Sequence, residues 1–120
     1  MYNFLCTAGI KAAMNTKYNG TLDIGKSKLF QYEVPKEGIT VLVQVTEGKL
    51  LLYGSHSNPD PSRVWHDYML SDICGDRKVI IPYPTAAAQR KQDAPVILFY
   101  CNLVGMEKSA FSIKAVSGTV

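Results

Sequence analysis

Two histidines and three cysteines are the side chains of this chain best suited to nucleophilic catalysis. His56 or His66 beside Cys74 or Cys101 would pair a base with a nucleophile if folding brought them together. Their spacing does not require this, and we interpret them as residues with separate roles. The sequence contains no P-loop, G-x-G-x-x-G, H-E-x-x-H or G-x-S-x-G motif. We therefore predict that the chain is not an enzyme, with a small cysteine-dependent enzyme as an alternative.

Four carboxylates, Asp60, Asp67, Asp72 and Asp76, lie close together in the sequence. As a general acid and base they would need a cleft and shifted pKa values. Asp60 and Asp72 are instead expected to cap turns, and Asp67 to bond the backbone amides of a loop. No carboxylate cluster has the spacing of metal ligands, so we expect no metal and no cofactor.

The three cysteines, Cys6, Cys74 and Cys101, are far apart and lack C-x-x-C spacing, so a zinc site is not expected. Two alternatives remain open. Cys74 and Cys101 form a disulfide, or all three are buried reduced thiols. Asn19 begins an Asn-Gly-Thr triplet and is a glycosylation candidate if the chain is secreted.

Aromatic side chains supply the candidate binding residues. In a regular strand, Trp65 and Tyr68 face opposite sides, and Trp65 shares its side with Arg63. Exposed rings beside Arg63 or Lys49 would suit stacking on a sugar or packing on a collagen-like polymer. The alternative is that these rings fill the core. The ligand-binding candidates are Tyr53, Arg63, Trp65, Tyr68 and Tyr100.

The elements that would position these residues are mainly strands, because alternating apolar and polar residues recur between turn signals. About eight strands, spaced as in a sandwich, are predicted. They cover residues 21–24, 28–34, 39–45, 49–53, 63–70, 78–81, 96–104 and 109–115. A turn at Glu47-Gly48 is expected to make a hairpin of the third and fourth strands. Residues 9–15 and 85–92 are short helix candidates.

These elements predict an all-β fold, a jelly-roll-like antiparallel β-sandwich over residues 20–120, after an N-terminal strand or extension over residues 1–19. The net charge of +3 comes from interspersed residues, so nucleic acid is not an expected partner. No apolar run approaches the ~20 residues of a membrane helix, so no membrane partner is expected. Met1–Cys6 lacks the basic region of a signal peptide, which suggests a cytosolic protein or a domain of a longer secreted chain.

Several segments, in order, resemble those of bacterial pre-peptidase C-terminal domains over about residues 20 to 116. These segments are Gly20–Leu22 with Gly25–Phe30, Val34–Pro35 with Gly38–Val41, Leu52–Ser55 with Asn58–Pro59 and His66–Tyr68, and Leu98–Gly105 with Phe111–Ile113. The resemblance implies a jelly-roll-like sandwich that serves as an accessory module of secreted proteins. Some members bind collagen or other polymers, and some bind calcium through acidic residues near the N-terminal edge. Residues 1–20 contain no Asp or Glu, so this calcium site is not expected here.

The predicted function is a non-catalytic binding or structural module of an extracellular protein or assembly. Its partner would be a protein or an extracellular polymer such as collagen or a glycan. An alternative is a self-assembling structural subunit, in which the uncharged segment Met1–Ala8 adds a strand to a neighbouring copy. That alternative makes the chain a homo-oligomer.

Overall fold

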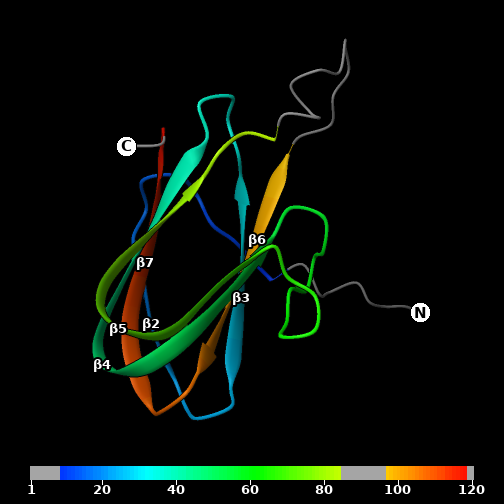
Figure 1. Ribbon diagram of the computed structural model, residues 1–120. Helices are drawn as coiled ribbons and strands as arrows, with labels where there is room; N and C mark the ends of the chain where they lie inside the picture. The colour runs from blue at the N-terminus through cyan, green and yellow to red at the C-terminus, as the bar shows by residue number, and fades with distance from the viewer. Residues whose placement is uncertain (1–8, 85–96, 119–120) are drawn as a thin grey trace.

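Strands arranged in two layers make up the computed structural model, which describes residues 9–84 and 97–118 (Figure 1). Every regular element in these two ranges is a strand, and none is a helix that could cross a membrane. The seven strands are β1 (Ile10–Lys11), β2 (Tyr18–Leu22), β3 (Ser27–Glu33), β4 (Ile39–Ser55), β5 (Tyr68–Ile81), β6 (Leu98–Gly105) and β7 (Ser109–Ser117). The prediction of an all-β sandwich is confirmed.

One strand, β4, belongs to both layers. Its first half, from Ile39 to Glu47, pairs with β7, and its last part, from Leu50 to Ser55, pairs with β6. β5 follows β4 along both parts on the other side. One layer is completed by β3 and β1 beyond β6, and the other by β2 beyond β7. Figure 1 shows β4 and β5 curving together from one layer into the other.

The predicted hairpin at Glu47-Gly48 is wrong, because residues 39–45 and 49–53 belong to one continuous strand. The chain bends there instead of reversing, and the β4–β5 register shifts between Val45 and Leu50. Gly48 (φ 81°) and its neighbour across the bend, Gly75 (φ 85°), both adopt the left-handed conformation that glycine tolerates. The predicted strands 63–70 and 78–81 likewise give way to the single strand β5, which runs through Asp72, the residue expected to cap a turn.

The N-terminal part also differs from expectation. The candidate helix over residues 9–15 is not formed, since Ile10–Lys11 pair as β1 with Phe30–Gln31 of β3. This pair is parallel, whereas the others are antiparallel. β2 pairs with β7 from Tyr18 onward, and the proposed division at residue 20 stays a prediction. Some predictions lie outside the described ranges. They are the strand-addition segment Met1–Ala8, which includes Cys6, and the second helix candidate over residues 85–92.

The core lies between the layers, where the alternating residues of each strand meet. Alternation over residues 39–45 predicts one apolar face, and the four β-branched residues of that face are at most 4% exposed: Ile39, Val41, Val43 and Val45. Phe30 and Tyr32 of β3 are fully buried, and the ring of Tyr18 meets Phe30 edge to face at 5.1 Å. Burial of each of the four β-branched side chains contributes roughly 1.5–3 kcal/mol to the free energy of unfolding. The predicted inward faces are therefore the ones that hold the layers together.

The bend shared by β4 and β5 gives a test of the fold through one glycine in each strand, Gly48 and Gly75. A Cβ at Gly48 would collide with the Lys108 carbonyl oxygen and approach the Ser109 hydroxyl to 2.5 Å. A Cβ at Gly75 would meet no atom within 4 Å, although its φ is similar. We expect Gly75→Ala to lower the free energy of unfolding by about 1–2 kcal/mol through backbone strain alone. Gly48→Ala should cost about 1–3 kcal/mol more, because the collision adds to the strain. Urea denaturation measures the free energy of unfolding of both variants. Equal losses would contradict the close approach of Gly48 to Lys108 and Ser109 at the bend.

Candidate functional site

The segment His56–Asp67, which joins β4 to β5, is the candidate functional site and is called the braced loop. It leaves β4 after Ser55 and returns to the sheet where the Asp67 amide donates to the Gly54 carbonyl at 2.8 Å. In between it contacts β6, where the buried Asn102 side chain donates to the Pro61 carbonyl at 3.0 Å. Asn102 lies opposite Tyr53, so the two side chains are on the same face of the sheet. The neighbouring Leu52 faces the core, so Tyr53 and Asn102 are on the outer face, and this is the face that the loop covers.

The base of the braced loop is held by one buried hydroxyl. Ser55 is fully buried, and its Oγ donates to the Asp67 carboxylate at 2.7 Å. The same oxygen accepts from the backbone amides of Ser57 (3.2 Å) and Asn58 (3.0 Å). Such local bonds from Ser, Asn and Asp stabilise turns. Asp67 was expected to bond loop amides directly, whereas here it orients the serine that accepts them.

The rest of the braced loop is held by bonds across its own width. The Asn58 side chain donates to the Trp65 carbonyl at 3.1 Å and accepts from the Asp60 amide at 3.0 Å. The Ser62 amide donates to the same Trp65 carbonyl at 3.0 Å. His66 Nδ1 lies 2.9 Å from the Ser62 carbonyl, which can only accept, so this nitrogen carries the proton. These bonds fix the loop before any partner binds.

The tip of the braced loop exposes apolar side chains despite this bracing. Val64 is 91% exposed and Trp65 57% exposed, and the neighbouring Arg63 is exposed as well. Tryptophan and arginine are the residue types that most often dominate binding energy at interfaces. The tip therefore presents a fixed group of the side chains that bind partners well.

The five candidate binding residues do not form one row. Arg63 and Trp65 lie in the loop tip. The strand predicted to begin at Arg63 begins only at Tyr68, so the alternation of faces along that strand does not apply to Trp65. Tyr53 is 6% exposed beneath the loop, with its ring 5.4 Å from that of His66. Tyr100 is half-buried on the same outer face, opposite Ser55.

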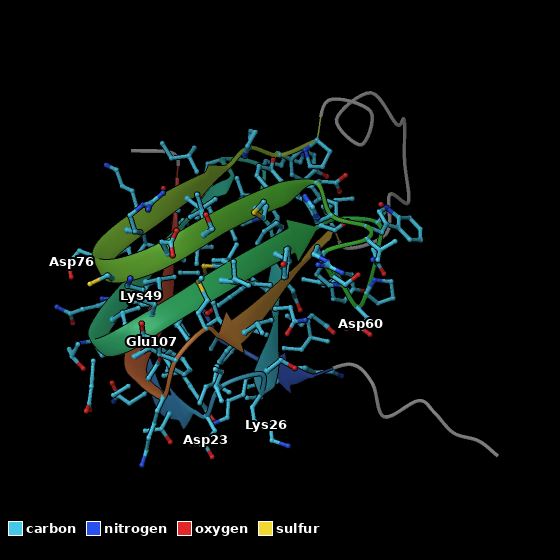
Figure 2. All side chains as sticks on the ribbon, turned by 60° about the horizontal axis from the view of Figure 1, so that its bottom comes forward. Asp23, Lys26, Lys49, Asp60, Asp76 and Glu107 are labelled. Carbon is cyan, nitrogen blue, oxygen red and sulfur yellow. The ribbon has the colours of Figure 1, made fainter. Side chains whose placement is uncertain are left out.

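Tyr68 lies apart from the other candidates, at the end of the core. It is opposite the inward-facing Gly54, and its ring meets Phe99 edge to face at 5.6 Å. His56 completes this group at 5.5 Å from Phe99, with its Nδ1 3.1 Å from the Leu98 carbonyl. Lys49, the other proposed neighbour of the rings, lies at the bend, away from loop residue Asp60 (Figure 2).

The candidate disulfide between Cys74 and Cys101 is not formed, and both are free thiols. Cys101 is buried on the inner face of β6, whereas Cys74 is exposed next to Gly75 at the bend. Within residues 9–84 and 97–118, no cysteine meets the histidines of the braced loop to form a catalytic pair. Burial raises the pKa of the Cys101 thiol to about 12, so it stays protonated near neutral pH.

The carboxylates are also dispersed. Figure 2 shows Asp60 on the side of the braced loop and Asp76 at the opposite side, by the bend. Over the described part of the chain, no three His, Cys, Asp or Glu side chains gather into a group that could hold a metal. Asn19, the glycosylation candidate, is exposed on β2 opposite Ser112.

Sequence reasoning missed Ser55, Asn58 and Val64. The signal was present in the run from Ser55 to Pro61, which is dense in Ser, Asn, Asp and Pro, the residues that bond to nearby backbone. These residue types indicate a polar loop, but they do not show that the loop is fixed. Val64 fell within the predicted strand over residues 63–70, on the side opposite Trp65. Its exposure follows from the later start of β5.

The fold is that of pre-peptidase C-terminal domains, as the sequence resemblance implies. One similar solved structure is the pre-peptidase C-terminal domain of a collagenase from Bacillus anthracis, with a TM-score of 0.59 and 10% identity over 88% of this chain and 92% of that one. At this identity the likeness shows the fold alone. PliG, a periplasmic inhibitor of g-type lysozyme from Aeromonas hydrophila, matches with a TM-score of 0.49 and 14% identity over 90% and 95% of the two chains. No protein-family model and no curated protein matches the sequence.

The bracing of the loop can be tested at Ser55. Ser55→Ala removes the acceptor of the buried Asn58 amide and the donor to Asp67, so we expect a loss of about 1–3 kcal/mol in the free energy of unfolding. Amide hydrogen exchange within residues 57–67 should also become faster. The control is Asp60→Ala in the same loop, which removes an exposed side chain and keeps the backbone amide that bonds to Asn58, so it should change both readouts little. Unchanged exchange in Ser55→Ala would contradict the bracing.

The buried thiol predicts a loss of stability in alkali. Above pH ~9 the unfolded chain loses the Cys101 proton, while the folded chain keeps it until its pKa of about 12. The unfolded state then binds fewer protons, so the free energy of unfolding falls by about 1.4 kcal/mol per pH unit across this range. Urea midpoints measured between about pH 8 and 10 should show the decline, and Cys101→Ala should remove most of it. An equal decline in the variant would contradict this assignment.

Proposed function

We propose that this chain is a non-catalytic binding module of an extracellular protein or assembly, and that the tip of the braced loop holds a protein partner. The observation that carries the proposal is the exposure of Val64 and Trp65 on a loop fixed by hydrogen bonds. An exposed apolar group is costly to keep in water unless a partner covers it. A flexible loop would lose conformational freedom on binding, whereas this one has already lost it.

A protein partner is favoured over a neutral sugar by the composition of the tip. Trp65 alone would suit either, since its ring can stack on a sugar or fill an apolar pocket. Val64, almost wholly exposed beside it, offers nothing to sugar hydroxyls but fits a pocket lined by apolar side chains. Arg63 supplies a charged donor at the rim. The partner class therefore includes fibrous proteins such as collagen.

The extracellular setting is part of the same proposal. Support comes from the fold, which is shared with a domain of a bacterial collagenase. Among the described residues, His56 and His66 bond to backbone carbonyls and neither bonds to Cys74 or Cys101, which supports the absence of catalysis of the Cys–His type.

Binding to fibrillar collagen tests the proposal directly. We expect the wild-type chain to bind immobilised collagen, and Trp65→Ala to weaken the binding by about thirtyfold, as for a central interface residue. Val64→Ala should weaken it by a smaller factor. The matched control is Ile24→Ala, which removes an apolar side chain that is 71% exposed in the turn between β2 and β3.

Three results would count against the proposal. Equal binding by wild type and Trp65→Ala would exclude the loop tip as the contact. Tighter binding to chitin than to collagen, lost in Trp65→Ala, would make the partner a glycan. Absence of binding to collagen and chitin would overturn a polymer partner for this loop.

A further inference from the structure

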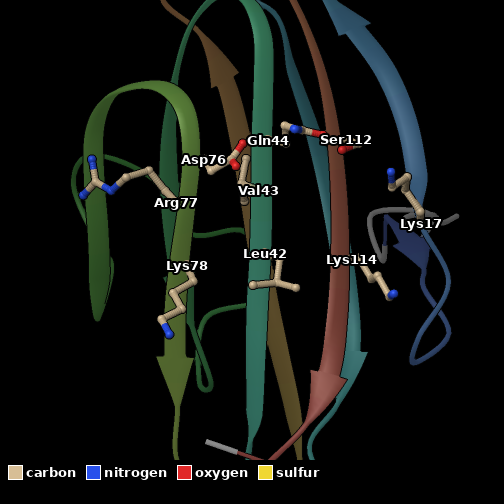
Figure 3. Close-up of a pocket in the computed structure, with 9 residues that line it drawn as sticks. All are labelled: Lys17, Leu42, Val43, Gln44, Asp76, Arg77, Lys78, Ser112 and Lys114. Atoms are coloured by element: carbon tan, nitrogen blue, oxygen red, sulfur yellow. The ribbon is translucent and has the colours of Figure 1, made fainter. Parts of the chain in front are cut away.

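A basic hollow of about 520 Å³ lies on the outer face of the other layer (Figure 3). It is formed by β4, β5 and β7 together with Lys17, which precedes β2. Its volume falls in the range of ligand sites in proteins. The lining residues include four cations and one carboxylate, in a chain whose net charge is only +3. The lining residues are Lys17, Leu42, Val43, Gln44, Asp76, Arg77, Lys78, Ser112 and Lys114.

Three of the cations form a row that crosses the strands. Leu42 of β4 pairs with Lys78 of β5 on one side and with Lys114 of β7 on the other. Two strand spacings separate these lysines at the backbone, about 10 Å. Lys17 comes next, because the following residue, Tyr18, pairs with Ile113. Figure 3 shows Leu42 between Lys78 and Lys114, with Lys17 beyond Lys114. The sheet thus presents positive charges at intervals set by its own geometry.

A row of uncharged and acidic hydrogen-bonding groups runs beside the cations. Gln44 pairs with Asp76 on one side and with Ser112 on the other, two residues along from Leu42. The two rows are therefore about 7 Å apart and face the same way. Leu42, at the base of the hollow, is 39% exposed and offers an apolar contact. A ligand lying across the strands would meet cations on one side and groups that bind hydroxyls on the other.

This pairing of rows favours one class of anionic ligand. An acidic peptide such as poly-L-glutamate offers carboxylates for the lysines but no hydroxyls for Gln44, Ser112 and Asp76. Nucleic acid strands are commonly held by base stacking on aromatic rings. None of the nine lining residues is aromatic. An acidic polysaccharide carries carboxylates or sulfates for the lysines and hydroxyls for Gln44, Ser112 and Asp76. Its charges match the excess of cations in the hollow.

We propose that the outer face of β5, β4 and β7, with Lys17, binds an acidic polysaccharide that lies across the strands. The site is on the opposite side of the sandwich from the braced loop and does not depend on what that loop binds. A chain of this polymer places its anionic groups along Lys78, Lys114 and Lys17, with its hydroxyls along Asp76, Gln44 and Ser112. The interaction weakens as salt rises, because the lysines are at the surface.

Binding to alginate, a polymer of uronic acids, tests the proposal, with poly-L-glutamate as the acidic peptide. The protein is produced without a glycan at Asn19, which lies next to Ser112 across the β2–β7 pair. We expect the wild-type chain to bind alginate more tightly than poly-L-glutamate at equal charge. The double variant Lys17→Ala/Lys114→Ala should weaken alginate binding about tenfold or more, since bonds to charged groups are lost. Gln44→Ala should weaken alginate binding more than poly-L-glutamate binding.

The matched control is Lys26→Ala/Lys108→Ala, which removes the same charge from exposed lysines outside the hollow. This control should retain the alginate affinity. An equal loss in both double variants would show attraction to net charge alone and overturn the site. Tighter binding to poly-L-glutamate would make the ligand an acidic protein segment. Failure to bind alginate at low salt would overturn the proposal, whatever the braced loop binds.

Discussion

The passage of β4 through both layers is the constraint on which the rest of the structure depends. A single strand can face inward in both layers only if its alternation changes phase at the bend. Inward residues are odd-numbered up to Val45 and even-numbered from Leu50 onward, and the left-handed Gly48 lies in the interval between them. β5 makes the same bend through Gly75. Two layers are therefore joined by continuous hydrogen-bonded backbone, not only by packing.

The faces of the strands could be predicted from sequence, because alternation records which side chains leave water. Phe30, Tyr32 and the four β-branched residues of β4 are buried as expected. The same pattern was misinterpreted at Glu47-Gly48, since a change of phase and a turn both interrupt alternation. Glycine is one of the residues favoured in turns, so Glu47-Gly48 was interpreted as a turn. A turn reverses the chain, whereas a change of phase does not. Whether the chain reverses at Gly48 depends on its pairing with β6 and β7, which are far away in sequence.

The candidate sites differed in how far sequence could predict them. Trp65 and Arg63 are near each other in the chain, so their residue types alone marked them as binding candidates. The lysines of the hollow come from three segments, around residues 17, 78 and 114. Single residues of either sign are spread through the sequence, and only the register of β5, β4 and β7 sets these three in line. Register is set by pairing, which alternation within one strand does not reveal.

The two outer faces of the sandwich are used differently. On one, Pro61 contacts Asn102 and the loop converts a sheet surface into a support for Trp65. On the other, the sheet surface itself is the floor of the hollow, with Leu42 and Gln44 exposed.

The order in which the strands assemble follows from the topology of the sandwich. The last two strands are the central ones: β6 lies between β3 and β4, and β7 between β4 and β2. A growing chain that has not yet produced Leu98–Ser117 leaves β2 and β3 without these partners. The sandwich therefore closes only after β6 and β7 have been made, and the edges of β2 and β3 stay exposed until these two strands are inserted beside β4.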